Sequence, residues 1–152
     1  MMQILITKRR CVVKRNLLLT GALLMVAVVV AACASQGGSA SDYTSVADSL
    51  RGAGVTIASG GEVSQPFFSG KGQAITVNGE QVQIFEYADE AAAEADAARV
   101  SADGSTVGTT MITWVATPHF YRSGKVIALY LGDDATVLTA LETVLGPQFA
   151  GR

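Results

Sequence analysis

The chain is poor in the residues that form chemical sites. Of its 152 residues only two are cysteine and only one, His119, is histidine. So few thiols and imidazoles provide neither a disulfide framework nor a cluster of zinc ligands. The Gly-x-Ser-x-Gly motif of hydrolases, the glycine-rich phosphate loop and the acidic spacing of a calcium loop are also missing. We therefore predict a protein that is not an enzyme, with no catalytic residues and no metal or cofactor.

Basic residues are scarce over most of the chain. All 13 acidic residues, but only six of the 11 basic residues, lie after residue 32, which gives residues 33–152 a net charge of −7. A surface of this sign repels the phosphate backbone of DNA and RNA. We therefore exclude nucleic acids as partners.

Long apolar runs are also rare, and the longest lies near the N-terminus. A basic segment that contains Lys8, Arg9 and Arg10 precedes a mainly apolar run of 16 residues, Leu17–Ala32. As a helix this run would be about 24 Å long, whereas the hydrocarbon core of a bilayer is about 30 Å thick. A basic start followed by a short apolar run is typical of an export signal. An uncleaved membrane anchor is the alternative.

The end of this run, Val30-Ala31-Ala32-Cys33, resembles the lipobox of a bacterial lipoprotein signal peptide. The resemblance implies that the chain is cut after Ala32, and that Cys33 becomes the N-terminus and carries acyl chains such as palmitate. Several acyl chains hold a protein stably on a membrane. We therefore expect a protein anchored to the cell membrane or to an outer membrane, facing the extracytoplasmic side. Ala34 favours the outer membrane weakly.

A second export pattern overlaps the basic segment. Residues 9–14, Arg-Arg-Cys-Val-Val-Lys, resemble the twin-arginine export motif. Lys8 stands where that family prefers serine or threonine, and two valines replace the usual phenylalanine and leucine. Basic residues that only orient the signal, as in general secretion, are the favoured alternative.

The chain after the signal is long enough for one domain with a single core. Residues 33–40 are small, polar and rich in glycine, and we predict a flexible tether there. Residues 41–152 are then the domain. Because Cys11 is lost with the signal and Cys33 is acylated, packing alone must hold this domain together.

Three segments have the hydrophobic periodicity of helices. The second is rich in alanine and covers residues 89–100, and the third ends at Gly146-Pro147. An acidic or hydroxyl side chain that can cap the first turn precedes each segment. The expected caps are Ser41 or Asp42, Asp89, and Asp133 or Asp134.

Two hairpins are expected between these helices. Asn78-Gly79 is the dipeptide favoured in two-residue turns, and it predicts a hairpin over residues 73–87 with Ile75 opposite Val82. A second hairpin is predicted over residues 120–127, with its turn at Ser123-Gly124. Residues 126–131 are apolar enough for a central strand covered on both faces.

Shorter strands are expected over residues 55–58 and 111–116, with a chain reversal at Gly60-Gly61 and an edge strand or bulge around Pro66. The alternation of helices and hairpins predicts an α+β domain of two layers. In this fold an antiparallel β-sheet carries the helices on one face.

His119 is the only histidine that could act in proton transfer. In a strand its side chain points the same way as that of Tyr121. It is either a proton donor or acceptor near an acidic ligand, or a strand residue that makes one hydrogen bond. Because no orienting carboxylate and nucleophile accompany it in a known motif, we do not expect catalysis. The acidic pairs Asp89-Glu90 and Asp133-Asp134 are better explained as helix caps than as metal ligands.

Aromatic side chains are the remaining candidates for a binding surface. A sheet with helices on one face has a second face, where aromatic rings from several strands could form an exposed patch for a partner or an apolar ligand. Packing within the core is the alternative. The candidate residues of this binding face are Trp114, His119, Tyr121 and Arg122.

Residues 114–132, followed by the helix that ends in Leu-Gly-Pro-Gln-Phe at residues 145–149, resemble uncharacterised small bacterial lipoproteins. That resemblance implies no activity. The sequence favours a lipid-anchored, non-catalytic domain that binds an envelope protein, with its specificity open. A module that binds a small ligand on its aromatic face is the alternative, and a small hydrolase is a weaker one.

Overall fold

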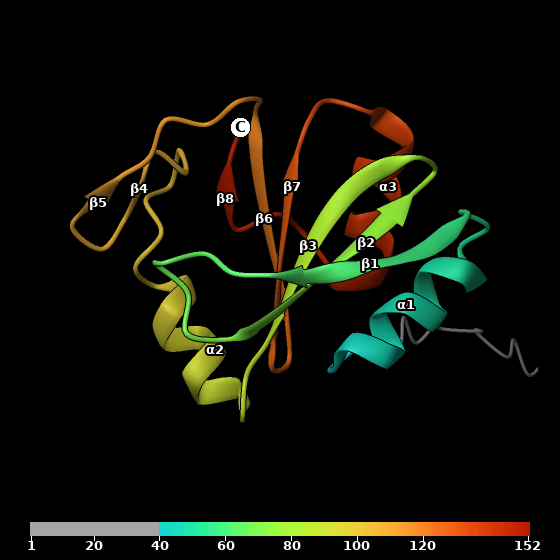
Figure 1. Cartoon of the computed structure of the whole chain (residues 1–152), viewed down its shortest axis with the longest axis horizontal. Helices are drawn as coiled ribbons and strands as arrows, with labels where there is room; N and C mark the ends of the chain where they lie inside the picture. Colours follow the sequence, from blue (N-terminus) through green and yellow to red (C-terminus); the bar gives the residue numbers. More distant parts are fainter. Residues whose placement is uncertain (1–39) are drawn as a thin grey trace, which may run out of the picture. The chain divides into compact units, whose positions relative to one another are not determined.

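The structure, a computed structural model, describes residues 40–152. The expected signal peptide, Cys33 and the tether up to residue 39 lie outside the described residues. Within residues 40–152 no helix is long and apolar enough to cross a membrane. Six antiparallel strands form one sheet in the order β1-β2-β3-β7-β6-β8, and two more form a separate small hairpin (Figure 1).

The helices are α1 (Tyr43–Gly52), α2 (Glu90–Ala97) and α3 (Ala135–Leu145). The strands of the large sheet are β1 (Ile57–Val63), β2 (Lys71–Val77), β3 (Glu80–Glu86), β6 (Pro118–Ser123), β7 (Val126–Leu131) and β8 (Ala150–Gly151). The small hairpin consists of β4 (Thr106–Val107) and β5 (Thr110–Met111).

An aspartate begins each helix, as expected. Asp42 forms a capping box with Ser45, in which each side chain accepts the other residue's backbone N–H at 2.8 to 3.0 Å. Asp89 accepts the backbone N–H of Ala92, and Asp134 accepts those of Thr136 and Val137. These bonds satisfy amide groups that have no partner inside the helix, and each is worth about 1 kcal/mol.

The β2–β3 hairpin confirms the predicted turn and register. Asn78 and Gly79 both have positive φ, 51° and 95°, which a tight two-residue turn requires. Ile75 lies opposite Val82, as expected. Asn78 also accepts the backbone N–H of Thr56 at 2.9 Å, which ties the approach to β1 to the turn.

The β6–β7 hairpin turns at Gly124-Lys125, one residue later than predicted. Gly124 has a φ of 52°, and a Cβ there would lie 2.9 Å from the Cβ of Ser41. The start of the domain therefore packs against this turn. β7 is the predicted central strand: it lies between β3 and β6, and its first five residues are fully buried.

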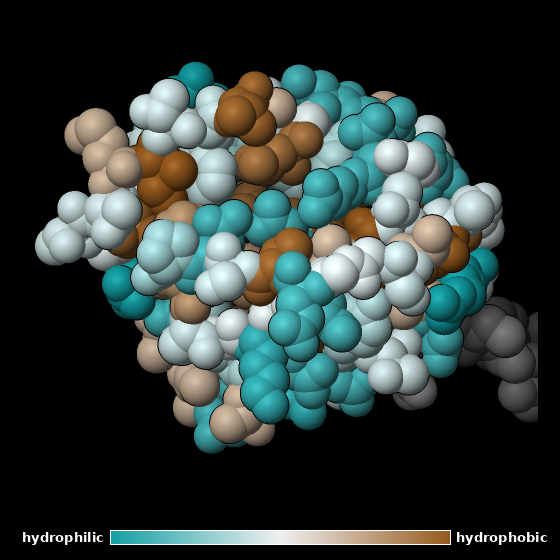
Figure 2. All heavy atoms as spheres, in the orientation of Figure 1, coloured by the Kyte–Doolittle hydropathy of each residue, from teal (hydrophilic) through white to brown (hydrophobic). Residues whose placement is uncertain are grey.

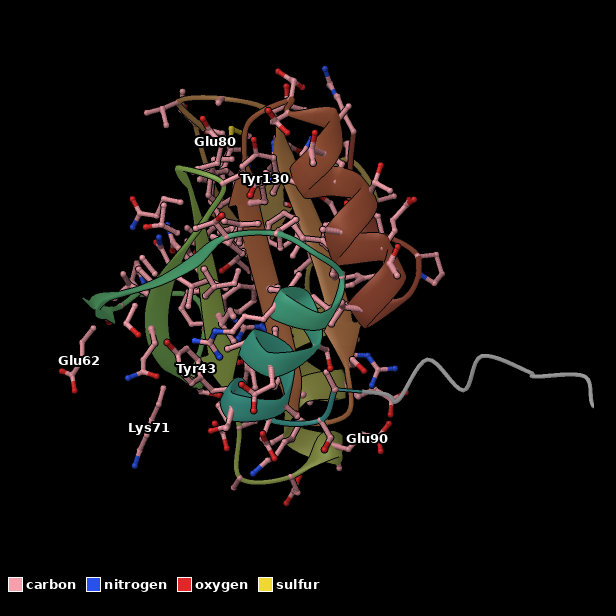
Figure 3. The ribbon with its side chains drawn as sticks, turned by 90° about the vertical axis from the view of Figure 1, so that its right-hand side faces the viewer. Tyr43, Glu62, Lys71, Glu80, Glu90 and Tyr130 are labelled. Carbon is pink, nitrogen blue, oxygen red and sulfur yellow. The ribbon has the colours of Figure 1, made fainter. Side chains whose placement is uncertain are left out.

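The two faces of the sheet are both covered. Ile84 and Ala128 face an aliphatic cluster with α1 and α3, whereas Phe85 and Ile127 face an aromatic cluster with α2. Figures 1 and 3 show α1 and α3 on one side of the sheet, and Figure 1 shows α2 and the β4–β5 hairpin on the other.

The α+β class and the antiparallel sheet are thus confirmed, and α1 and α3 share one face as expected. The placement of α2 differs from the two-layer prediction. Its alanines Ala93 and Ala97 pack on the opposite face, together with Phe67 and Phe68 from the loop after β1. The physical reason is that β7 is apolar on both faces, so one layer of helices would leave Ile127 and Leu129 in water.

Two local predictions were wrong. Gly60 and Gly61 do not reverse the chain but lie inside β1, where the register with β2 shifts between Ser59 and Glu62. A Cβ on Gly60 would lie 2.7 Å from that of Ala74, so glycine permits this irregular pairing. In the segment 111–116 only Met111 belongs to a strand, and the rest is a loop that leads to β6.

Candidate functional site

The four residues predicted to form a binding face are not brought together. Trp114 and Arg122 lie on the α2 face, whereas His119 and Tyr121 point into the α1–α3 face. Arg122 is half-buried and pairs with Glu90 at the start of α2, 3.5 Å away. Sequence periodicity placed His119 beside Tyr121 correctly, but both side chains are buried rather than open to a ligand.

Tyr121 is part of the aliphatic cluster. Its side chain is fully buried against α1 and α3, and burial together with the charge of Glu142 raises the pKa of Tyr121 to about 12. Its ring therefore contributes to stability and is not a contact surface.

His119 is held in a defined orientation. Its Nδ1 lies 2.7 Å from Oε1 of Gln148, and the ring stacks on that of Tyr130 with 6.0 Å between centroids. Because a carbonyl oxygen only accepts, Nδ1 carries the proton of the neutral ring. Nε2 is buried without a hydrogen-bond partner in residues 40–152, and Oδ1 of Asp133 lies 4.0 Å from it.

The aromatic rings do converge, but as a core. Phe67 and Phe120 each meet Trp114 edge to face, at 5.9 and 5.8 Å between ring centroids. The indole N–H of Trp114 donates to the backbone oxygen of Gly104 at 2.7 Å. Such pairs add stability beyond the area that they bury. Trp114 thus pins the loop before β6 to the α2 face and remains half-buried at its rim.

Three large apolar side chains around this rim stand in solvent. Met111 is 81% exposed, Val115 93% and Phe149 36%. The ring centroid of Phe149 lies 6.1 Å from that of Phe120, the same ring that Trp114 contacts. Met111 and Val115 are the chain neighbours of Ile112 and Trp114, which pack on this aromatic cluster. Figure 2 shows apolar surface near β4 and near the start of β6. We name Met111, Val115 and Phe149 the apolar patch. The sequence prediction missed it because residues 111–116 were expected to be a strand.

The apolar patch lies at the end of the domain remote from Ser41. Ser41 packs against the β6–β7 turn, whereas the loop that carries Val115 leads into the opposite end of β6. A strand of six residues is about 20 Å long. We name the end with Ser41 and Gly124 the N-terminal pole and the end with Val115 and Pro118 the distal pole. Figure 3 shows the same separation, with Tyr43 and Glu90 below and Glu80 and Tyr130 above.

Charged groups border the apolar patch. Asp103 precedes Gly104, the partner of Trp114, and hydrogen bonds from the Ser101 hydroxyl and from Ser105 lower the pKa of Asp103 to about 2. Asp133, which is exposed, lies on the other side, near His119. Arg152 is a basic residue here, and its backbone bonds Pro118. With Asp134 at the start of α3, the exposed charges at the distal pole are mainly negative.

A second surface feature lies at the N-terminal pole. Residues of β1, β2, β3, α1 and the β6–β7 turn line an open hollow of about 1330 Å³. Lys125 pairs with Glu86 at 2.8 Å, and Glu86 also accepts the backbone N–H of Tyr43 at 3.3 Å. Among the described residues Lys71 makes no ion pair, and Figure 3 shows it projecting outward near Glu62.

A buried polar network lies beneath this hollow. Asp96 accepts hydrogen bonds from the backbone and hydroxyl of Ser69 and from Arg99. Burial raises the pKa of Asp96, but these bonds outweigh it and lower the pKa overall. Burial and the nearby Asp96 carboxylate raise the pKa of Tyr87, whose hydroxyl is buried without a hydrogen-bond partner in the described chain. The network anchors the loop before β2 to α2.

The two surfaces differ in what they can bind. In the part of the chain that the structure describes, no three His, Cys, Asp or Glu side chains gather closely enough to hold a metal ion. The apolar patch can exclude water against a second apolar surface, and the hollow can attract an anion to Lys71. Comparison of the chain with protein-family models, with curated proteins and with solved structures gives no match in any of the three.

Proposed function

We propose that this protein is a lipid-anchored extracytoplasmic domain that binds an envelope protein through the apolar patch and has no catalytic role. The observation that carries the proposal is the exposure of Met111 and Val115 on a rigid aromatic base at the distal pole. Large apolar side chains that stand in water on a well-packed base are typical of a protein contact.

The position of the patch supports this function. Residues 33–39, between the acylated cysteine and the buried Ala40, can span at most about 25 Å. Ala40 enters beside Ser41 at the N-terminal pole, so this pole stays near the membrane. The apolar patch then faces away from the bilayer, where a partner in the envelope can reach it.

The charge around the patch favours a basic partner. Residues 33–152 carry a net charge of −7, and Asp103 stays ionised down to about pH 2. A second copy of the chain would bring like charges together, which opposes association. A partner with apolar residues flanked by lysine or arginine would be stabilised both by burial of apolar surface and by attraction between opposite charges. Opposite charges also speed the encounter of the two proteins.

The anchor is tested first. Intact-protein mass spectrometry of the membrane fraction should give a chain that begins at Cys33 with added acyl mass. Cys33→Ala should remain unprocessed and unacylated. A wild-type chain of full mass would mean that residues 17–32 stay as a membrane helix, and the anchor proposal would be wrong.

The partner surface is tested by photo-crosslinking in intact cells. A photoreactive residue at position 115 should give one crosslinked species, whose partner peptide contains basic residues next to apolar ones. The same residue at position 139, on the exposed side of α3, is the matched control and should give none. Equal crosslinking at 115 and 139 in a correctly anchored protein would contradict a specific contact at the patch.

A small-ligand module is the second candidate, and the hollow at the N-terminal pole favours it. Its free lysine, Lys71, would bind an anionic group. A ligand that binds only the folded state raises the melting temperature by mass action. Anionic metabolites should then raise the melting temperature of the wild type but not of Lys71→Ala. If no anion stabilises either protein, this alternative fails.

A further inference from the structure

His119 connects two loops of the distal pole through its two ring nitrogens. Nδ1 donates to Gln148, which precedes Phe149 of the apolar patch, and the backbone N–H of Phe149 bonds the oxygen of Phe120 at 2.9 Å. Nε2 faces Asp133, and the preceding residue, Gly132, donates its backbone N–H to Thr117 at 3.0 Å. The Gly132 loop is thus bonded to the segment 114–117 that carries Val115, and the Phe149 loop is bonded to Phe120, whose ring contacts Trp114 of that segment.

When the ring is neutral, Nε2 and Asp133 do not form a hydrogen bond. With its proton on Nδ1, the ring presents a lone pair at Nε2 to the carboxylate of Asp133, and two acceptors cannot bond. Asp133 accordingly stays 4.0 Å away with its side chain 76% exposed. His119 itself is only 5% exposed, so Nε2 has no free access to solvent.

We propose that His119 is a proton-operated latch that orders the distal pole and so controls how the apolar patch is presented to a partner. One proton taken from solvent adds to Nε2 and turns it into a donor, while Nδ1–H keeps its bond to Gln148. The new N–H then bonds Oδ1 of Asp133, and the charge of the imidazolium is balanced by that carboxylate. In the acid form the ring of His119 is hydrogen-bonded to both loops. In the neutral form it is bonded only to the loop that carries Gln148.

Several charged groups lie around His119. Asp133 faces Nε2 directly, and the carboxylates of Asp134 and Glu80 lie around Tyr130, the ring on which His119 stacks. Arg152 is the basic residue on the neighbouring strand side, where its backbone bonds Pro118. Imidazole ordinarily changes charge between pH 5 and 8, the range that a domain outside the cytoplasm meets as its surroundings acidify. This last step, the control of docking, rests on the proposed function.

The latch can be tested without a partner, because the chain has one histidine and one tryptophan. Nuclear magnetic resonance of the full-length protein in detergent micelles would follow the imidazole Cε1–H of His119, the indole N–H of Trp114 and the amide of Phe149 from pH 8 to pH 5. We expect all three signals to move with one shared midpoint. Asp133→Asn should lower that midpoint by about half a pH unit and remove most of the response of Trp114 and Phe149.

Glu80→Gln is the matched control, since it removes the same charge from the same pole beyond the reach of Nε2. It should keep the response of Trp114 and Phe149 and move the midpoint by less than Asp133→Asn does. Three results would overturn the latch. The first is no titration of His119 between pH 5 and 8, and the second is a titration that leaves the signals of Trp114 and Phe149 unchanged. The third is an equal effect of Asp133→Asn and Glu80→Gln on the midpoint and on these signals. None of these bears on whether the apolar patch crosslinks to a partner, so the latch and the proposed function fail separately.

Discussion

The two faces of the sheet are covered by different kinds of side chain and element, and they leave different surfaces exposed. On the α1–α3 face, two capped helices seal an aliphatic core that includes Leu50, Val137 and Leu141. On the α2 face, a helix of eight residues covers little, and loops fill the rest with aromatic rings. The loops leave Met111 and Val115 in solvent. We therefore expect the first face to supply most of the stability, and we propose the second for recognition, since loops on a rigid scaffold often carry binding residues.

The largest expected effect concerns the sealed face. Leu141→Ala removes a fully buried side chain between α3 and the sheet. Because α3 and the sheet can close only part of the cavity that the substitution leaves, the free energy of unfolding should fall by about 3 kcal/mol. Urea denaturation followed by circular dichroism measures this. A loss below about 1 kcal/mol would show that this face is not the main source of stability.

The same face should also contribute to stability in alkali. Tyr121 has a pKa raised to about 12 in the folded protein, above the ordinary value of 10. The unfolded chain therefore loses its proton first, so the stabilisation from the neutral tyrosine is complete below about pH 10 and disappears as the pH rises to about 12. Tyr121→Phe should flatten the fall in melting temperature between about pH 10 and 12. An unchanged profile would assign the alkaline loss to another group.

On the α2 face, substitution of Trp114 should lower the free energy of unfolding by less than Leu141→Ala does. Trp114→Phe keeps a ring against Phe67 and Phe120 but removes the hydrogen bond to Gly104. The free energy of unfolding should fall by about 1 to 2 kcal/mol, because a half-buried carbonyl loses its donor. Thermal unfolding measures the loss. Hydrogen exchange at Gly104 and Ser105 should also rise, whereas exchange in α3 should stay as it was.

How far the sequence could predict these faces depends on how local the signal is. The hairpin turn at Asn78-Gly79, the caps Asp42 and Asp89 and the burial of β7 follow from short-range rules, and the structure confirms them. The side of the sheet on which α2 packs depends on long-range pairing, about which its alanines carry no information. The exposure of Val115 depends on the indole bond of Trp114 to Gly104, ten residues away. A loop held by such a bond shows no hydrophobic periodicity from which the exposure of its side chains could be predicted.

Acid should weaken the loop at the rim. Hydrogen bonds from Ser101 and Ser105 lower the pKa of Asp103 to about 2, so the folded protein keeps this carboxylate charged after the unfolded chain has taken up a proton. The stabilisation is therefore present above about pH 4 and lost as the pH falls toward 2. Asp103→Asn should make stability depend less on pH between 4 and 2. Because Asp103 is exposed, we expect a smaller change than that from Tyr121→Phe.

The smallest effect on stability, and the most informative for function, is expected at the apolar patch. Val115 is 93% exposed, so Val115→Asp removes almost no buried surface and should change the free energy of unfolding by less than about 0.5 kcal/mol. The new carboxylate would nevertheless place a charge at the centre of the proposed contact, next to Asp103 and opposite a partner's apolar side chains. Crosslinking from position 111 should then fall at least tenfold. Thr139→Asp, the same change of charge at an exposed position of α3, should leave it unaltered. A crosslink that persists in Val115→Asp would place the contact with the partner elsewhere. The side chains exposed on the α2 face would then result from the course of its loops and would have no binding role.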